Sequence, residues 1–264
     1  MINDLIYVYC VSDKLPEPEI DLASNGLNML AINDFIVFFK HVPGFEFSEE
    51  NLKRNISDIQ WLEINARDHF MIISLIMGGC NVIPFKFGTI YNSPDSLTNF
   101  ITEYSSSLIE NFDFIRGKEE WTVKIYCDRI SLNKQIDELS EEAAEMEKQI
   151  MASSPGKAFL LKRKKYDLVE NEMDRLCTQY GQDYYDIFKN LSKSNRLNNL
   201  LPKEFTGREE TMILNTAFLV CKDKVTDFIN TADDLRKRDE NSGFFIEVTG
   251  PWPPFSFISI KEKQ

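Results

Sequence analysis

The side chains best suited to acid–base or metal chemistry are scarce in this sequence. The chain has two histidines, His41 and His69, and five cysteines, and none of them falls in the C-x-x-C or H-x-x-x-H spacings typical of zinc sites. His69 lies near the apolar stripe of a predicted helix, where a single histidine is typically a hydrogen-bonded core residue. Asp68 points about 100° away around that helix. We therefore predict no catalytic dyad, no metal and no cofactor.

Phosphate-binding glycine motifs are also missing. Neither G-x-G-x-x-G nor G-x-x-x-x-G-K-[ST] occurs, and the glycines of "MGGC" (77–80) lead into a strand-like run rather than into a helix. Carboxylate pairs such as Glu119-Glu120 are expected by chance among 42 acidic residues. An enzyme would need a cluster of perturbed titratable groups, which the sequence does not offer, so we predict no catalytic site.

One segment is strongly basic. Its cations are Lys162, Arg163, Lys164 and Lys165, with Lys157 upstream. Such a run is typical of the solvated face of a long helix that pairs with glutamates of a neighbouring helix, and it also suits an acidic patch on a partner. The sequence leaves both interpretations open.

Charge and composition limit the classes of partner. Thirty Lys and Arg against 42 Asp and Glu give a formal net charge of −12 and a pI near 4.8, so nucleic acid would be repelled. The five cysteines lie mostly in apolar runs, which is typical of reduced thiols in a cytoplasmic protein. The N-terminal "MINDLIYVYCV" lacks the features of a signal peptide, and glycine, asparagine and proline interrupt the longest apolar run. We therefore expect no lipid membrane partner.

The pattern of residues 1–117 predicts an N-terminal α+β domain, a sheet with two helices. Asn33-Asp34 is expected to be the two-residue turn of a β-hairpin, and Ser93 followed by Pro94 marks a helix start. Apolar periodicity places strands at 5–11, 28–32, 35–39 and 81–91, and helices at 56–77 and from Ser93 through an apolar stripe that ends at Phe112.

Residues 118–249 predict a second domain with a long helical hairpin over 131–198. Apolar residues recur with coiled-coil heptad spacing from Leu132 to Ile150, "SSPG" (153–156) breaks the pattern, and a second stripe runs from Leu161 to Leu191. Strands are expected at 121–127, 212–221 and 243–250, with a helix before the last. The order β-α-α-β-α-β is a ferredoxin-like pattern with an enlarged first crossover.

The C-terminal tail, residues 250–264, contains "GPWPPFSF". Its prolines exclude the middle of a helix or sheet, so the segment is expected to be extended. The aromatics either pack onto the protein's own core or bind a partner. We favour an intermediate arrangement, in which a rigid segment along a sheet edge or domain junction buries part of its aromatic surface and leaves the rest to a partner. The residues concerned are Pro251, Trp252, Pro253, Pro254, Phe255 and Phe257.

Four segments in register resemble the GvpF/GvpL family of gas vesicle proteins. They are "NVIPFKFGTIY" after the helix containing His69, "EEWTVKIYCD", "PGKAFLLKRK" and "GPWPPFSF". The resemblance implies a non-enzymatic accessory protein of gas vesicle formation, with two ferredoxin-like α/β domains, a long helical part and a C-terminal tail. It also implies contact with the small, very hydrophobic shell protein GvpA, early in assembly, and a location in the gas vesicle that for some members is the gas-facing side of the shell.

The family motifs fall on three groups of residues. Phe255 stands where the family commonly has tyrosine, so aromatic stacking is kept and a hydroxyl is lost. The matching positions are Pro84, Phe87, Gly88 and Thr89 in the first domain, Glu120, Trp121 and Lys124 at the junction, and Gly250, Pro251, Trp252, Pro253, Pro254 and Phe257 in the tail.

The residues themselves agree with such a role. A strongly acidic protein with aromatic docking elements is suited to keeping apolar shell subunits apart before the shell closes. The alternative is a general cytosolic adaptor whose helical hairpin pairs with a partner's helix. That alternative predicts binding that survives loss of the tail.

Overall fold

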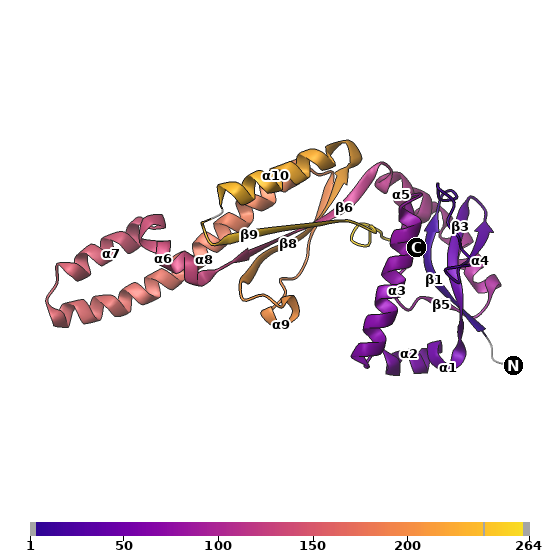
Figure 1. Ribbon diagram of the computed structural model, residues 1–264, viewed down its shortest axis with the longest axis horizontal. Coiled ribbons are helices and arrows are strands. Elements are labelled where there is room, and N and C mark those ends of the chain that lie inside the picture. Colours follow the sequence, from indigo (N-terminus) through magenta and orange to yellow (C-terminus); the bar gives the residue numbers. More distant parts are fainter. Residues whose placement is uncertain (1–3, 240, 261–264) are drawn as a thin grey trace. The chain divides into compact units, whose positions relative to one another are not determined.

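The computed structural model describes residues 4–239 and 241–260 and consists of two compact units (Figure 1). The first unit combines the chain up to Glu120 with the segment from Pro251 onward, and the second is Trp121–Gly250. The segment from Pro251 onward therefore groups with the first unit, and positions 261–264 lie outside the described residues. That 1–117 and 118–249 are independent domains stays a prediction.

The first unit is built around an antiparallel sheet of order β2-β3-β1-β4, with β5 also paired to β1. Its strands are β1 (Asp4–Ser12), β2 (Asn28–Ile32), β3 (Phe35–Pro43), β4 (Val82–Pro84) and β5 (Ile90–Tyr91). The hairpin turn predicted at Asn33-Asp34 is confirmed, with Asn33 in the left-handed region at φ 52°. The strand predicted over 81–91 is instead two short strands separated by a turn.

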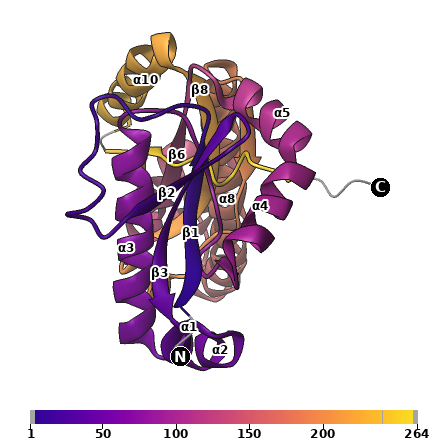
Figure 2. The ribbon, with the colours of Figure 1, turned by 90° about the vertical axis from the view of Figure 1, so that its right-hand side faces the viewer.

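Helices cover both faces of this sheet: α3 lies on one side, and α4 and α5 lie on the other (Figure 2). The helices are α1 (Gly44–Phe47), α2 (Glu49–Asn55), α3 (Ile59–Met77), α4 (Pro94–Glu103) and α5 (Ser105–Ile115). The helix expected from residue 56 begins at Ile59, because Asp58 caps it by accepting from two backbone N–H groups. The apolar stripe that ends at Phe112 falls on two helices, because the backbone leaves helical geometry at Tyr104 (φ −93°, ψ 10°).

Strand β1 supplies side chains to both cores of the first unit. Ile6 and Val8 pack with α4 and α5, whereas Tyr7 and Tyr9 pack with α3. A shift in the pairing of β1 with β3, between Val8 and Cys10, adds Cys10 to the α3 side. Since both faces of the sheet are covered, this strand is buried along nearly its whole length.

The second unit contains a four-stranded sheet of order β7-β8-β6-β9. Its core lies between this sheet and the helices α8 and α10. The strands are β6 (Lys118–Cys127), β7 (Ser194–Leu197), β8 (Thr211–Cys221) and β9 (Phe244–Trp252). The helices are α6 (Arg129–Leu139), α7 (Glu141–Met151), α8 (Pro155–Asn190), α9 (Lys203–Thr206) and α10 (Val225–Arg238), with a short 3₁₀ turn η1 (Lys222–Lys224) before α10.

The predicted helical hairpin is present in this unit, where α7 and α8 extend beyond the sheet (Figure 1). Its first arm is two helices rather than one. Ser140 is buried and extended (φ −129°, ψ 115°), and its hydroxyl accepts from the backbone N–H of Ala143, which starts α7 anew. Heptad spacing does not reveal this break, because the apolar positions keep their spacing on both sides of Ser140. The break comes from the serine side chain, which caps the new helix.

The ferredoxin-like arrangement expected of both halves is not confirmed. In the first unit three strands precede the first helix, which differs from the β-α-β-β-α-β order of that fold.

A candidate docking site formed by the C-terminal tail

Buried His69 on α3 holds the turn between β4 and β5. Its Nε2 lies 3.0 Å from the carbonyl oxygen of Phe85, and its Nδ1 lies 3.0 Å from the Tyr7 hydroxyl. A carbonyl only accepts, so Nε2 carries the proton and Nδ1 accepts from Tyr7. Burial lowers the pKa of His69, in agreement with a neutral ring. The prediction that His69 is a hydrogen-bonded core residue is confirmed.

The motif residues of this turn have structural roles. Gly88 has φ 80°, a backbone conformation that favours glycine, and a Cβ there would also lie 3.1 Å from Cδ2 of Leu52. The Gly88 N–H donates to the Tyr7 hydroxyl at 3.2 Å, and the Thr89 hydroxyl donates to the carbonyl of Lys86 at 2.7 Å. The turn is therefore fixed by side chains of β1 and α3. Pro84 ends β4, and the ring of Phe87 packs edge-on against His69, Tyr7 and Trp61.

Glu120 holds the tail at Ser256. One carboxylate oxygen accepts from the backbone N–H of Ser256 at 3.0 Å, and the other accepts from its hydroxyl at 2.6 Å. Glu120 is buried, and this burial raises the pKa of the carboxyl to about 7, although both hydrogen bonds act in the opposite direction. The motif glutamate thus positions the tail.

Asn111 on α5 holds the tail a second time. Its side-chain oxygen accepts from the backbone N–H of Ser259, and its amide donates to the Ser259 carbonyl, both at 3.0 Å. No sequence pattern marks Asn111 or Ser259 as partners, because the two residues are 148 positions apart and neither belongs to a recognisable local motif.

The tail presents its aromatics unequally. Phe257 is buried with 4% of its surface exposed, whereas Phe255 is 40% exposed, with its ring centroid 6.4 Å from that of His69. Trp252 is half-buried and packs on Phe70 of α3, with ring centroids 5.2 Å apart. Pro253 and Pro254 are buried, and Pro251 is exposed. The structure therefore packs the tail onto the first unit and leaves part of its aromatic surface open.

A groove of about 430 Å³ lies between the tail and the β4–β5 turn. Phe255, Ile258 and Ile260 contribute from the tail, while Phe85 and Phe100 contribute from the body of the unit. Its walls are largely apolar, with the motif residues Pro84 and Thr89 and the exposed Lys86 also lining it. Such a groove is suited to an apolar segment of a partner.

The basic run lies elsewhere, on α8 of the second unit. Lys165 donates to Glu147 of α7 at 2.8 Å, as expected for the solvated face of a helix hairpin. Lys162, Arg163 and Lys164 are exposed. The structure thus accounts for one of the four cations by an ion pair within the hairpin.

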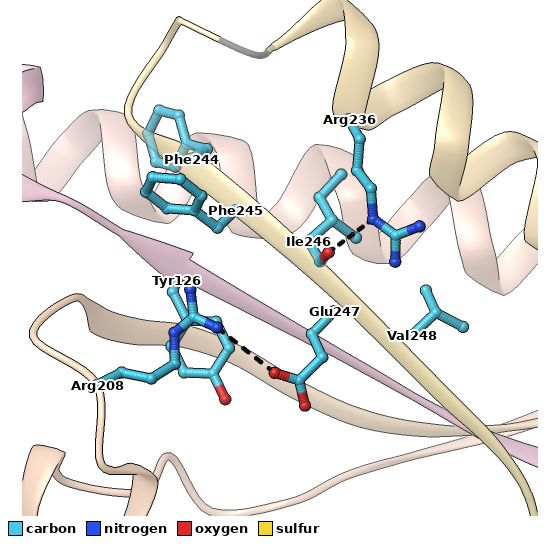
Figure 3. A pocket seen from close by; sticks show the side chains of 8 residues that line it. All are labelled: Tyr126, Arg208, Arg236, Phe244, Phe245, Ile246, Glu247 and Val248. Atoms are coloured by element: carbon cyan, nitrogen blue, oxygen red, sulfur yellow. Dashed lines mark hydrogen bonds and ion pairs between the residues drawn. The ribbon is translucent and has the colours of Figure 1, made fainter.

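A second hollow, of about 390 Å³, borders β9 in the second unit (Figure 3). The Arg208 guanidinium lies 4.3 Å from the ring centroid of Tyr126 and 3.6 Å from Glu247. The motif residue Lys124 lies 3.7 Å from the same Glu247. Arg236 donates to the carbonyl of Ile246 at 2.8 Å. These polar groups pair with one another, which is typical of structural stabilisation. Motif residue Trp121 is buried in the core between the sheet and the helices.

Between residues 4 and 260, position 240 excepted, no group of three or more His, Cys, Asp and Glu is arranged to hold a metal ion. The helices of the same ranges are all too short or too polar to cross a bilayer.

Comparisons with known proteins agree on one family. A family model described as gas vesicle synthesis protein GvpL/GvpF matches residues 5–259. Gas vesicle protein L of Streptomyces sp. (strain CB03234) is 23% identical over 268 residues, which cover 98% of this chain and 95% of that protein. The crystal structure of GvpF from Anabaena sp. PCC7120 aligns with a TM-score of 0.70 at 18% identity, over 98% of this chain and 99% of that one. GvpF from Microcystis aeruginosa aligns with a TM-score of 0.65 at 17% identity, over 97% and 99% of the two chains. These structures show a common fold.

Proposed function

Because the chain belongs to the gas vesicle synthesis protein GvpL/GvpF family, we propose that it is a non-enzymatic accessory protein of gas vesicle assembly that binds the shell protein GvpA through its C-terminal tail. In this role it acts in the cytoplasm and at the gas vesicle. It assists nucleation or early growth of the shell by shielding apolar GvpA subunits until they are incorporated.

The observation that carries this proposal is the apolar groove beside exposed Phe255. The tail that forms one wall is fixed at Ser256 by Glu120 and at Ser259 by Asn111. A rigid wall loses little conformational freedom when a partner binds, so more of the contact energy appears as affinity. An apolar segment of GvpA is the occupant that this surface suits.

We also infer that the second unit is a ferredoxin-like domain. Its strand order β7-β8-β6-β9 is that of a split β-α-β arrangement. In this arrangement α6 to α8, between β6 and β7, are the first crossover, and α10, between β8 and β9, is the second. The helical hairpin is then an enlargement of the first crossover, as the sequence pattern predicts.

The test compares three variants for GvpA capture and for thermal unfolding on the same preparations. Phe255→Ser is expected to abolish capture at a smaller cost in stability than loss of a core aromatic, because 40% of this residue is exposed. Trp252→Ala is expected to lower the free energy of unfolding by less than about 3 kcal/mol and also to abolish capture and vesicle formation. Phe245→Ser is the matched control, since Phe245 is likewise 40% exposed but lies in the second unit.

A Phe255 or Trp252 variant that melts normally and still captures GvpA like the unchanged protein would remove the tail from the binding site. The alternative would then be favoured, an adaptor that binds through the helical hairpin, where Phe159 and Leu160 of α8 are exposed.

A further inference from the structure

The turn of the helical hairpin is an apolar and basic projection of the second unit. Met151, Phe159 and Leu160 are 77%, 72% and 62% exposed there. All five charged residues between Met151 and Tyr166 are cations, although the whole chain has a net charge of −12. Lys165 forms an ion pair with Glu147, whereas Lys162, Arg163 and Lys164 are exposed. We call residues 151–164 the helical tip.

The first unit contains a pocket of opposite character, formed by the segment between β1 and β2. Its volume is about 350 Å³, and its wall is mostly apolar, with Leu15 54% and Met29 50% exposed. Glu17 and Glu19 line the same pocket and are exposed to solvent. We call it the acidic pocket.

We propose that the helical tip of one copy of this chain docks into the acidic pocket of a second copy. The tip offers apolar side chains bordered by cations, and the pocket offers an apolar surface bordered by carboxylates, so apolar burial and charge complementarity act together. Each surface alone leaves large apolar side chains in water. The contact does not involve the groove beside Phe255, where GvpA is proposed to bind.

The contact has a consequence for assembly, because it joins two different surfaces. After one tip has entered one pocket, the pair still has a free pocket and a free tip. Such a heterologous contact continues into open chains unless a ring closes. We therefore expect species larger than dimers as the protein concentration rises.

Charge reversal tests the contact by sedimentation of the full chain. The tip variant carries Lys162→Glu, Arg163→Glu and Lys164→Glu, and the pocket variant carries Glu17→Lys and Glu19→Lys. Each variant alone is expected to associate at least about tenfold more weakly than the unchanged protein, because like charges then face each other. An equimolar mixture of the two variants is expected to regain association, since the reversed tip meets the reversed pocket.

Matched controls separate this contact from general charge effects. Lys203→Glu, Lys222→Glu and Lys237→Glu change three exposed lysines of the second unit and make the same change in net charge, so association is expected to stay as in the unchanged protein. Phe159→Ser is expected to weaken association, whereas Phe205→Ser, at an 80% exposed position outside the tip, is not. A single-chain mass for the unchanged protein up to about 1 mM would overturn the proposal, as would a variant mixture that stays dissociated.

Discussion

The tail of the first unit and the helical tip of the second each expose a phenylalanine. The contacts that hold these two segments in place join residues at very different separations along the chain. The tail is fixed by Glu120 and Asn111, which lie 136 and 148 positions from their partners. At the base of the tip, Lys165 pairs with Glu147 only 18 positions away, and the Ser153 hydroxyl donates to the Gln149 carbonyl within one helical turn.

The two surfaces should therefore fail in different ways. The tail surface exists only when the first unit is folded and its buried polar groups are satisfied, so changes at its anchors should affect both stability and binding. The tip is part of a local hairpin whose exposed residues contribute little to stability. Changes there should affect association without affecting folding.

The largest effect is expected from a matched pair of phenylalanine substitutions. Phe257→Ala removes an aromatic that is 4% exposed and should lower the free energy of unfolding by about 3 to 5 kcal/mol. Phe159→Ala, at the tip, should change it by less than about 0.5 kcal/mol. Urea denaturation measures both. Equal losses in the two variants would contradict the contrast between a packed tail and a solvated tip.

The next largest effect concerns the pH dependence of Glu120. Burial raises its pKa in the folded protein to about 7 from an ordinary value of 4.5, so the folded state holds this proton more tightly than the unfolded state does. The contribution to stability is therefore fully present below about pH 4.5 and is lost as the pH rises through 7. Relative to Glu120→Gln, the unchanged protein should lose on the order of 3 kcal/mol of stability between about pH 4.5 and pH 8.

Thermal unfolding across this pH range measures the difference. Glu119→Gln is the control, because it removes the neighbouring carboxyl but not the contact with Ser256. A flat difference between the unchanged protein and Glu120→Gln would mean that Glu120 stays ionised in the folded state.

A smaller effect is expected from Asn111→Ala. The substitution leaves the N–H and the carbonyl of Ser259 without their partner, at a cost of about 1 to 2 kcal/mol because water still reaches Ser259. Hydrogen exchange should show faster exchange at the tail and unchanged exchange in the hairpin. Faster exchange in α7 and α8 as well would mean that the two regions are not energetically separate.

The smallest effect is expected at the ion pair of Lys165 with Glu147. A double-mutant cycle with alanine at both positions should give a coupling energy of at most about 1 kcal/mol, because the pair is partly solvated. A larger coupling would assign a stabilising role to the basic run and would weaken the case for the tip as a free surface.

Much of the secondary structure follows from the sequence. Asn33-Asp34 makes a hairpin turn because asparagine tolerates the left-handed backbone that Asn33 adopts, and Ser93 with Pro94 starts α4 by capping its first turn. These signals act within a few residues and need no tertiary partner.

The errors arise where local signals compete or are weak. Ser140 ends one helix and starts the next although the heptad pattern continues through it. Strand β7 has the sequence Ser-Asn-Arg-Leu, which lacks β-branched residues, and it forms because β8 offers its backbone and Tyr185 donates to Asn195. Propensity cannot indicate such a strand, because its stability comes from its neighbours.

The same division holds for the candidate site. The sequence by itself predicted an extended "GPWPPFSF", since proline fixes φ and removes the backbone donor. This is correct as far as Trp252, where β9 ends, but the following residues form a turn in which the Phe257 N–H donates to the Pro254 carbonyl. The sequence also offers no zinc or phosphate motif. Only the tertiary structure decided that Glu120 and Asn111 hold the tail, that Phe257 is buried while Phe255 is exposed, and that a groove lies beside them. The physical reason is that burial and hydrogen-bond partners are properties of residues brought together across more than a hundred positions, whereas backbone preference belongs to each residue and its immediate neighbours.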